Sequence, residues 1–162
     1  MSKILHGIPL DASQIVDENG EITYDNVYFS KDFADWAKSY FGNGIVVPKA
    51  ETITTQFQIE EQTNTSIKIN PGIIVINGRT GFLDEYHVED LDPIISTTRI
   101  DRIVVELNLT EAVNAFRVVV LKGEESSTPT APELTRNESA EIWQLSLARV
   151  LISATGITSI VD

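Results

Sequence analysis

The residues with the most potential for polar chemistry stand at the head of an apolar segment. Arg99 and Arg102 enclose Asp101, and a β-branched and apolar run follows up to Leu107. Two fixed cations so close together need acceptors nearby, and Asp101 can satisfy only part of that need. The segment therefore either braces a corner of the fold or faces a partner. We predict a structural brace, in which Asp101 bridges one or both arginines, or the arginines reach carboxylates between residues 84 and 92.

Residues for catalysis are scarce in this chain. The two histidines, His6 and His87, are not spaced with a serine or a carboxylate in a way that indicates a triad. There is no cysteine to act as a nucleophile or zinc ligand, and no glycine-rich phosphate-binding motif. We therefore expect a protein that is not an enzyme and that binds no cofactor.

The densest acidic region surrounds His87. Its carboxylates belong to Asp84, Glu85, Glu89, Asp90 and Asp92. A hard cation such as Ca²⁺ needs several such oxygens, but this spacing matches no calcium loop and lacks the glycine that a tight loop requires. We predict solvated acidic loops here and no metal site.

Charge and length narrow the class of protein. The chain has 162 residues and a net charge of -12, from 24 acidic and 12 basic residues. This length predicts one domain, or one domain with a small appendage. An acidic chain argues against nucleic acid or an anionic membrane as the main partner. The sequence starts without a signal peptide and has no apolar run long enough to span a bilayer, so we expect a soluble protein made in the cytoplasm.

One amphipathic helix is predicted at about residues 31–41. Its apolar stripe follows the spacing i, i+3, i+4, i+7, i+8 and consists of Phe33, Trp36, Ala37, Tyr40 and Phe41. The stripe either packs on a sheet or forms a helix–helix seam in an oligomer. Its aromatic members Phe33, Trp36, Tyr40 and Phe41 are our candidate interface residues.

Turn signals divide most of the remaining chain into hairpins. Asn19-Gly20 predicts a hairpin over residues 15–24. Asn70-Pro71-Gly72 predicts a type II turn that joins residues 65–69 to 73–76, and Asn77-Gly78 ends this hairpin. Further predicted elements are a third hairpin of residues 102–109 and 115–121, a long loop over 122–138, a strand over 142–152 and a short tail over 157–161.

These elements predict an α+β, mainly β fold. Antiparallel hairpins would form a sandwich or a barrel-like sheet with the helix packed on it. We divide the chain into an N-terminal arm and hairpin, residues 1–24, and a single mainly-β attachment domain, residues 25–162.

Two prolines punctuate the long loop. Pro129 and Pro132 have the spacing of a P-x-x-P ligand for an aromatic groove. The interpretation we prefer is that they stiffen a crossover that lies against a neighbour, so both are candidate interface residues.

Several short motifs follow one another between residues 24 and 162. They are Tyr24-Asp25-Asn26-Val27-Tyr28, Lys31-Asp32-Phe33-Ala34, Phe41-Gly42-Asn43-Gly44-Ile45, Asn70-Pro71-Gly72 with Asn77-Gly78, the strand from Arg99 to Leu107, the loop residues Pro129, Pro132, Leu134, Thr135 and Arg136, and Leu145, Leu147 and Ala148 in the last strand. This order resembles the N-terminal region of phage tail-fibre and baseplate structural proteins from Gram-positive hosts.

The resemblance implies a non-enzymatic component of the virion, in a phage tail or tail-like particle, made in the cytoplasm of the host bacterium. The implied mechanism is docking to other tail or baseplate proteins, commonly as a homotrimer. Family members usually continue into a fibre shaft or a receptor-binding head, and that part would hold the receptor-binding residues. The resemblance over residues 24–162 therefore assigns no receptor-binding residues here. The alternative is a carbohydrate-binding module that contacts the host cell wall, with Trp143, Tyr86 and Phe82 as candidate contact residues.

Overall fold

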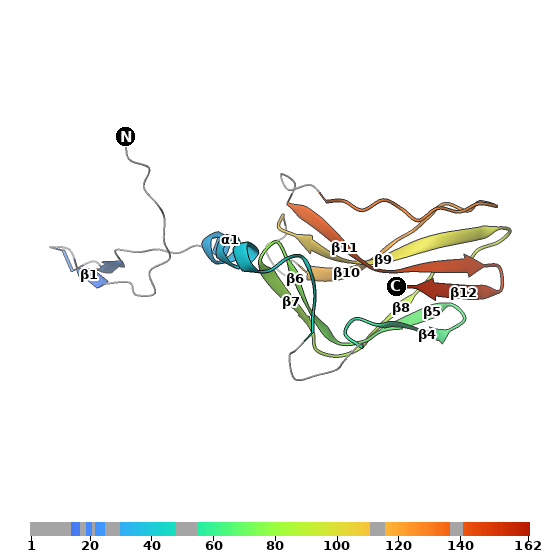
Figure 1. Ribbon diagram of the computed structural model, residues 1–162, viewed down its shortest axis with the longest axis horizontal. Coiled ribbons are helices and arrows are strands. Elements are labelled where there is room, and N and C mark those ends of the chain that lie inside the picture. The colour runs from blue at the N-terminus through green and yellow to red at the C-terminus, as the bar shows by residue number, and fades with distance from the viewer. Residues whose placement is uncertain are drawn as a thin grey trace.

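Two layers of antiparallel strands enclose one hydrophobic core (Figure 1). In this computed structural model the described residues are 14–16, 19–20, 22–24, 30–47, 55–110, 116–136 and 141–162. One layer is a four-stranded sheet in the order β10-β9-β11-β12, and two three-stranded sheets, β3-β6-β7 and β4-β5-β8, form the other. Within the described residues the sheets do not close into a barrel.

The strands are short except for β9 and β11. The four-stranded sheet contains β9 (Thr98–Asn108), β10 (Phe116–Leu121), β11 (Ile142–Ser153) and β12 (Gly156–Val161). The other layer contains β3 (Gly44–Val46), β4 (Ile59–Thr63), β5 (Ser66–Ile69), β6 (Gly72–Ile76), β7 (Arg79–Leu83) and β8 (His87–Asp90). A separate hairpin pairs β1 (Gln14–Val16) with β2 (Ile22–Tyr24), and the helix α1 covers Ser30–Tyr40.

The central strand β9 is buried on both of its faces. Ile103, Val105 and Leu107 point into the core, as expected for alternate residues of a strand. Val104 and Glu106 on the opposite face are buried as well. This outer face has its own cover, because residues 122–136 return across it.

The returning segment is fixed at both edges of the sheet. The Ser126 amide donates to the Thr98 carbonyl at 2.9 Å, beyond the end of β10. The Gln144 amide donates to the Thr135 carbonyl at 2.9 Å, on the edge of β11 that β12 leaves unpaired near Ile142. Residues 127–134 therefore cross the outer face, as the extended trace above β9 and β11 shows in Figure 1. The predicted long loop is thus an extended strap, which we call the crossing segment (residues 122–136).

The mainly-β class with a single short helix is confirmed, and so are several elements. The β1–β2 hairpin surrounds Asn19-Gly20, where Gly20 has a φ of 81°. β9 pairs with β10 as the predicted third hairpin, although residues 111–115 of its turn lie outside the described part. The tail over residues 157–161 is the greater part of strand β12.

The predicted Pro-Gly hairpin is wrong. β5 pairs with β4 and β8, whereas β6 pairs with β3 and β7, so Asn70-Pro71 lies where the chain passes between two sheets. The hairpin turn is Asn77-Gly78, with φ values of 50° and 72°, which joins β6 to β7. Positive φ at both central residues matches the twist of paired strands, whereas a type II turn splays them. Gly72 has no positive φ and instead allows the Phe57 ring to approach, since a Cβ there would lie 2.5 Å from that ring.

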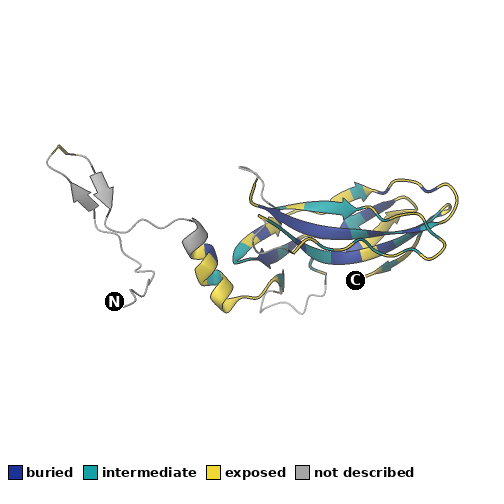
Figure 2. Ribbon diagram, turned by 90° about the horizontal axis from the view of Figure 1, so that it is seen from above, coloured by how far each residue is buried: buried dark blue, intermediate teal, exposed yellow. Residues whose placement is uncertain are grey.

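The helix forms where predicted, but its aromatic stripe does not pack on a sheet. Trp36 is 51% exposed and Tyr40 is 72% exposed, whereas Ala34 is buried. Gly78 of the β6–β7 turn lies against the carbonyl of Ala34, so the helix contacts this turn through its backbone near Ala34. Figure 2 shows α1 largely exposed, while buried residues gather in the strands.

Candidate functional site

The predicted brace joins Arg99 to Asp101 inside the protein. The Arg99 Nε donates to Asp101 Oδ1 at 2.7 Å, and Nη2 donates to Oδ2 at 2.8 Å. Each side chain is only 1% exposed. The two residues lie two positions apart on one strand, so both face the same side, and the guanidinium can meet the carboxylate through two parallel bonds.

The same ion pair ties two other parts of the chain to β9. The Arg99 Nη2 also donates to the Asp92 carbonyl at 2.8 Å, which fixes the segment between β8 and β9. The Gly123 amide donates to Asp101 Oδ1 at 2.9 Å, which fixes the start of the crossing segment. At the surface Lys122 Nζ donates to Asp92 Oδ2 at 2.8 Å. The buried pair of Arg99 and Asp101 holds strand ends together, which is a structural role.

Arg102 is not brought into this cluster. It lies on the outer face of β9, directly opposite Arg149 of β11. Its Nε is buried and has no hydrogen-bond partner in the described structure. Asp101 therefore bridges one of the two arginines, Arg99, and Arg102 does not join the brace, because strand alternation sends neighbouring side chains to opposite faces.

A second polar network on the outer face was not found from the sequence. Arg117 Nη2 donates to Glu106 Oε1 at 2.7 Å, and Gln144 Nε2 donates to Glu106 Oε2 at 2.7 Å. The Thr135 amide then donates to Gln144 Oε1 at 2.9 Å. Glu106 and Gln144 are both buried, so this network holds the crossing segment on β9, β10 and β11. Glu106, the one charge in an otherwise apolar run, was the only signal in the sequence.

The candidate interface residues of α1, together with Phe41 directly after it, form an exposed surface, which we call the aromatic helix face (Phe33, Trp36, Tyr40 and Phe41). All four side chains are more than half exposed. The rings of Trp36 and Tyr40 contact each other with centroids 5.4 Å apart. Pro129 and Pro132 of the crossing segment are half-buried. The structure does not contain a partner, so the interface role of these residues stays a prediction.

The acidic region around His87 forms strand β8 and its flanking turns. His87 Nε2 lies 2.9 Å from Glu89 Oε2. The hydrogen bond from Lys122, and next its positive charge, lower the pKa of the exposed Asp92 carboxyl. The described residues contain no group of three or more side chains placed to hold a metal ion. His6 lies outside them.

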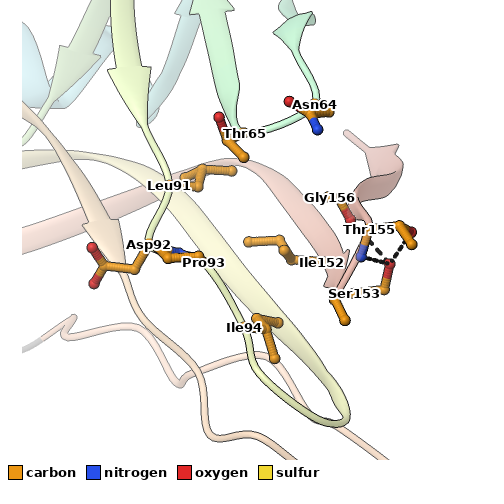
Figure 3. Close-up of a pocket in the computed structure, with 11 residues that line it drawn as sticks. Asn64, Thr65, Leu91, Asp92, Pro93, Ile94, Ile152, Ser153, Thr155 and Gly156 are labelled. Carbon is orange, nitrogen blue, oxygen red and sulfur yellow. Dashed lines mark hydrogen bonds between the residues drawn. The ribbon is translucent and has the colours of Figure 1, made fainter.

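A small cavity lies at the end of the sandwich where three turns meet (Figure 3). It measures about 70 Å³, which is room for a few water molecules. Leu91, Ile94 and Ile152 form its apolar part, and Ser153 and Thr155 hydrogen-bond each other at 2.9 Å on its rim. Among these lining residues no hydroxyl is hydrogen-bonded to a carboxylate or a histidine.

The described part of the chain has no helix long and apolar enough to cross a membrane. Comparison of the chain with family models, with curated proteins and with solved structures found no match. Its function must therefore be argued from its residues and their geometry.

Proposed function

We propose that this protein is a structural component of a phage tail or tail-like particle, where it attaches other tail or baseplate proteins by docking. The proposal joins the order of motifs described above to one structural observation, the aromatic helix face. In this proposal the protein is not an enzyme, assembles as a homo-oligomer with a trimer favoured, and resides in the virion.

The exposed aromatic area supports docking. A buried aromatic side chain removes about 150–250 Å² from water, so four that are half or more exposed leave roughly 350–550 Å² of aromatic surface. A typical monomer has a largest apolar patch of about 300–600 Å², and such a patch often has a function. The face is about half of what one partner contributes to a stable complex, roughly 800 Å².

The helix is also placed to present this face. Its backbone at Ala34 contacts Gly78 of the β6–β7 turn, and the Asn77 amide donates to Asn43 Oδ1 at 2.6 Å just beyond the helix. With the helix attached in this way, the side chains of Trp36 and Tyr40 stay more than half exposed. An exposed tryptophan and tyrosine with few rotatable bonds are typical of interface centres.

Assembly of particles tests the proposal. The chain would be co-expressed with the proteins encoded by the genes on either side of its own, and particles would be purified on a density gradient. We expect the chain in the particles, with antibody label at the baseplate end of the tail in electron micrographs. Particles that assemble fully without the chain would contradict the proposal.

A variant pair locates the docking surface. Trp36→Ser combined with Tyr40→Ser should reduce incorporation into particles at least tenfold, since aromatic interface centres contribute 2 kcal/mol or more each. Ile95→Ser is the matched control, because Ile95 is 91% exposed and does not belong to the aromatic helix face. Equal incorporation of both variants would exclude the helix as the docking surface.

The alternative, a carbohydrate-binding module, draws on two other exposed rings. Phe82 and Tyr86 are 65% and 63% exposed, and Lys68 Nζ lies 5.8 Å from the centre of the Tyr86 ring. Trp143 is partly buried and packs against the core, so it does not join them. Retention of the isolated chain on purified cell walls, lost in Phe82→Ala and Tyr86→Ala, would favour this alternative over the attachment module.

A further inference from the structure

A groove lies on the outer face of the four-stranded sheet, on the part next to β12. It measures about 200 Å³ and is lined by Ile100, Leu151 and Val161, with Arg149 and Ser159. The lining residues belong to β9, β11 and β12, and they lie on the face opposite the core. The groove therefore combines an apolar floor with a cationic side, which we call the arginine groove.

The positive charge at this groove is unmatched. Arg149 and Arg102 are cross-strand neighbours, and like charges in this position destabilise a sheet. Within the described residues neither arginine forms an ion pair, and Arg102 has a buried Nε without a partner. Acidic residues outnumber basic residues two to one in this chain, and still no described carboxylate pairs with either arginine. Two arginines side by side without acids in so acidic a protein indicate an anionic partner.

A turn on the other layer carries the complementary chemistry. Asp84, Glu85 and Tyr86 join β7 to β8, and all three are exposed. Neither carboxylate has an ion-pair partner among the residues that the structure describes. The neighbouring ring of Tyr86 is a large apolar surface. We call this segment the acidic turn (residues 84–86).

We propose that the arginine groove of one copy binds the acidic turn of a second copy. The carboxylates of Asp84 and Glu85 would accept hydrogen bonds from the guanidinium groups of Arg149 and Arg102. The ring of Tyr86 would cover the apolar floor and stack on a guanidinium group.

This contact is head-to-tail. The groove and the turn lie in different layers of the sandwich, so each copy offers both surfaces to different neighbours. Such a heterologous contact generates a closed ring when the rotation between copies closes, and a filament when it does not. The proposal does not depend on a role in virions, and it uses a surface separate from the aromatic helix face.

Charge reversal in solution tests the contact. The chain alone would be studied by sedimentation velocity over a series of protein concentrations at low and high salt. We expect self-association that weakens with salt, because both surfaces are charged and partly solvated. Arg149→Glu and Glu85→Arg should each raise the dissociation constant roughly tenfold or more. The double variant with both reversals should recover most of the affinity, since the contact is again complementary.

A matched control separates this contact from general charge effects. Glu61→Arg changes the net charge as much as Glu85→Arg but lies on β4, so it should leave the dissociation constant within about twofold. Circular dichroism of each variant would show that the fold is kept. A wild-type chain that stays monomeric at every concentration overturns the proposal. So does association that both single reversals leave unchanged, or a loss that the double reversal does not restore. None of these results bears on incorporation into particles.

Discussion

Asp101 accepts three hydrogen bonds at a position that is almost closed to solvent. Two come from the Arg99 guanidinium and one from the Gly123 amide. A buried pair of this kind adds little net stability compared with apolar residues of the same size, but removing one partner leaves an isolated buried charge. Asp101 therefore contributes to stability mainly by neutralising the buried charge of Arg99.

This asymmetry predicts two different outcomes. Asp101→Ala should lower the free energy of unfolding by roughly 3–5 kcal/mol, measured by urea denaturation, because Arg99 stays buried without its carboxylate. Replacing both residues, Arg99→Met with Asp101→Leu, should recover a large part of that loss. If Asp101→Ala unfolds at the same urea concentration as the wild type, the brace has no structural role.

Asp92 provides a second test at the scale of single residues. The hydrogen bond from Lys122, followed by the charge of Lys122, lowers the pKa of its carboxyl, and the charge of Arg99 adds to this. A lowered pKa means that the stabilisation is present above the ordinary pKa of aspartate and is lost as the pH falls through the lowered value. Lys122→Met should raise the Asp92 pKa toward its ordinary value, as followed by carbon NMR of the carboxyl group. An unchanged titration curve would show that Lys122 does not hold this carboxylate in solution.

At the scale of elements, the crossing segment depends on one glutamine. Gln144 accepts from the Thr135 amide and donates to Glu106, so it joins the segment to the buried side of the network. Gln144→Leu should cost about 1–3 kcal/mol of stability, because the Thr135 amide and a Glu106 oxygen each lose a partner. Hydrogen exchange at Thr135 should accelerate more than exchange in β9. Gln62→Leu, on the exposed side of β4, is the control and should change neither quantity.

The positions of helices and turns could be predicted from the sequence where short-range signals alone determine them. The stripe from Phe33 to Phe41 fixed the position of α1, and Asn19-Gly20 located the first hairpin. The exposure of the stripe could not be read from its spacing, because the helix meets the sheet elsewhere, where Gly78 of a distant turn lies against the backbone of Ala34. Exposed aromatic residues and core aromatic residues have the same period.

The pairing of strands was predicted less well. Asn70-Pro71-Gly72 and Asn77-Gly78 both signal turns. Only Asn77-Gly78 forms a hairpin, because a tight hairpin needs a turn whose twist matches that of the paired strands. For the brace, the types of the residues were sufficient to predict an ion pair between Arg99 and Asp101. Applying the alternation of a strand would also have separated Arg102 from that pair. The Glu106 network required knowledge that residues 122–136 return over the sheet, and nothing local to the sequence indicates this.

For the whole molecule, the aromatic helix face and the core should respond differently to mutation. Trp36→Ser with Tyr40→Ser should leave the melting temperature of the isolated chain nearly unchanged, because surface changes usually stay within about 0.5 kcal/mol. Ile103→Ala, at a fully buried position of β9, should cost about 2–5 kcal/mol. Differential scanning calorimetry distinguishes the two. A large loss in the helix variant would mean that these rings contribute to the fold of a single copy.

The connectivity of the four-stranded sheet sets an order for biosynthesis. β9 pairs with β11 from Asn108 and Ile142 out to Thr98 and Ser153, so its second neighbour is translated long after β9 itself. Contacts between such distant segments slow folding. During this interval β9, which is rich in β-branched residues, has an unpaired edge on the side of β11, and an unpaired strand edge is a template for pairing with another chain. Yield in expression should therefore depend on how quickly the ribosome completes β11 after β9, and on chaperones that bind the nascent chain before then.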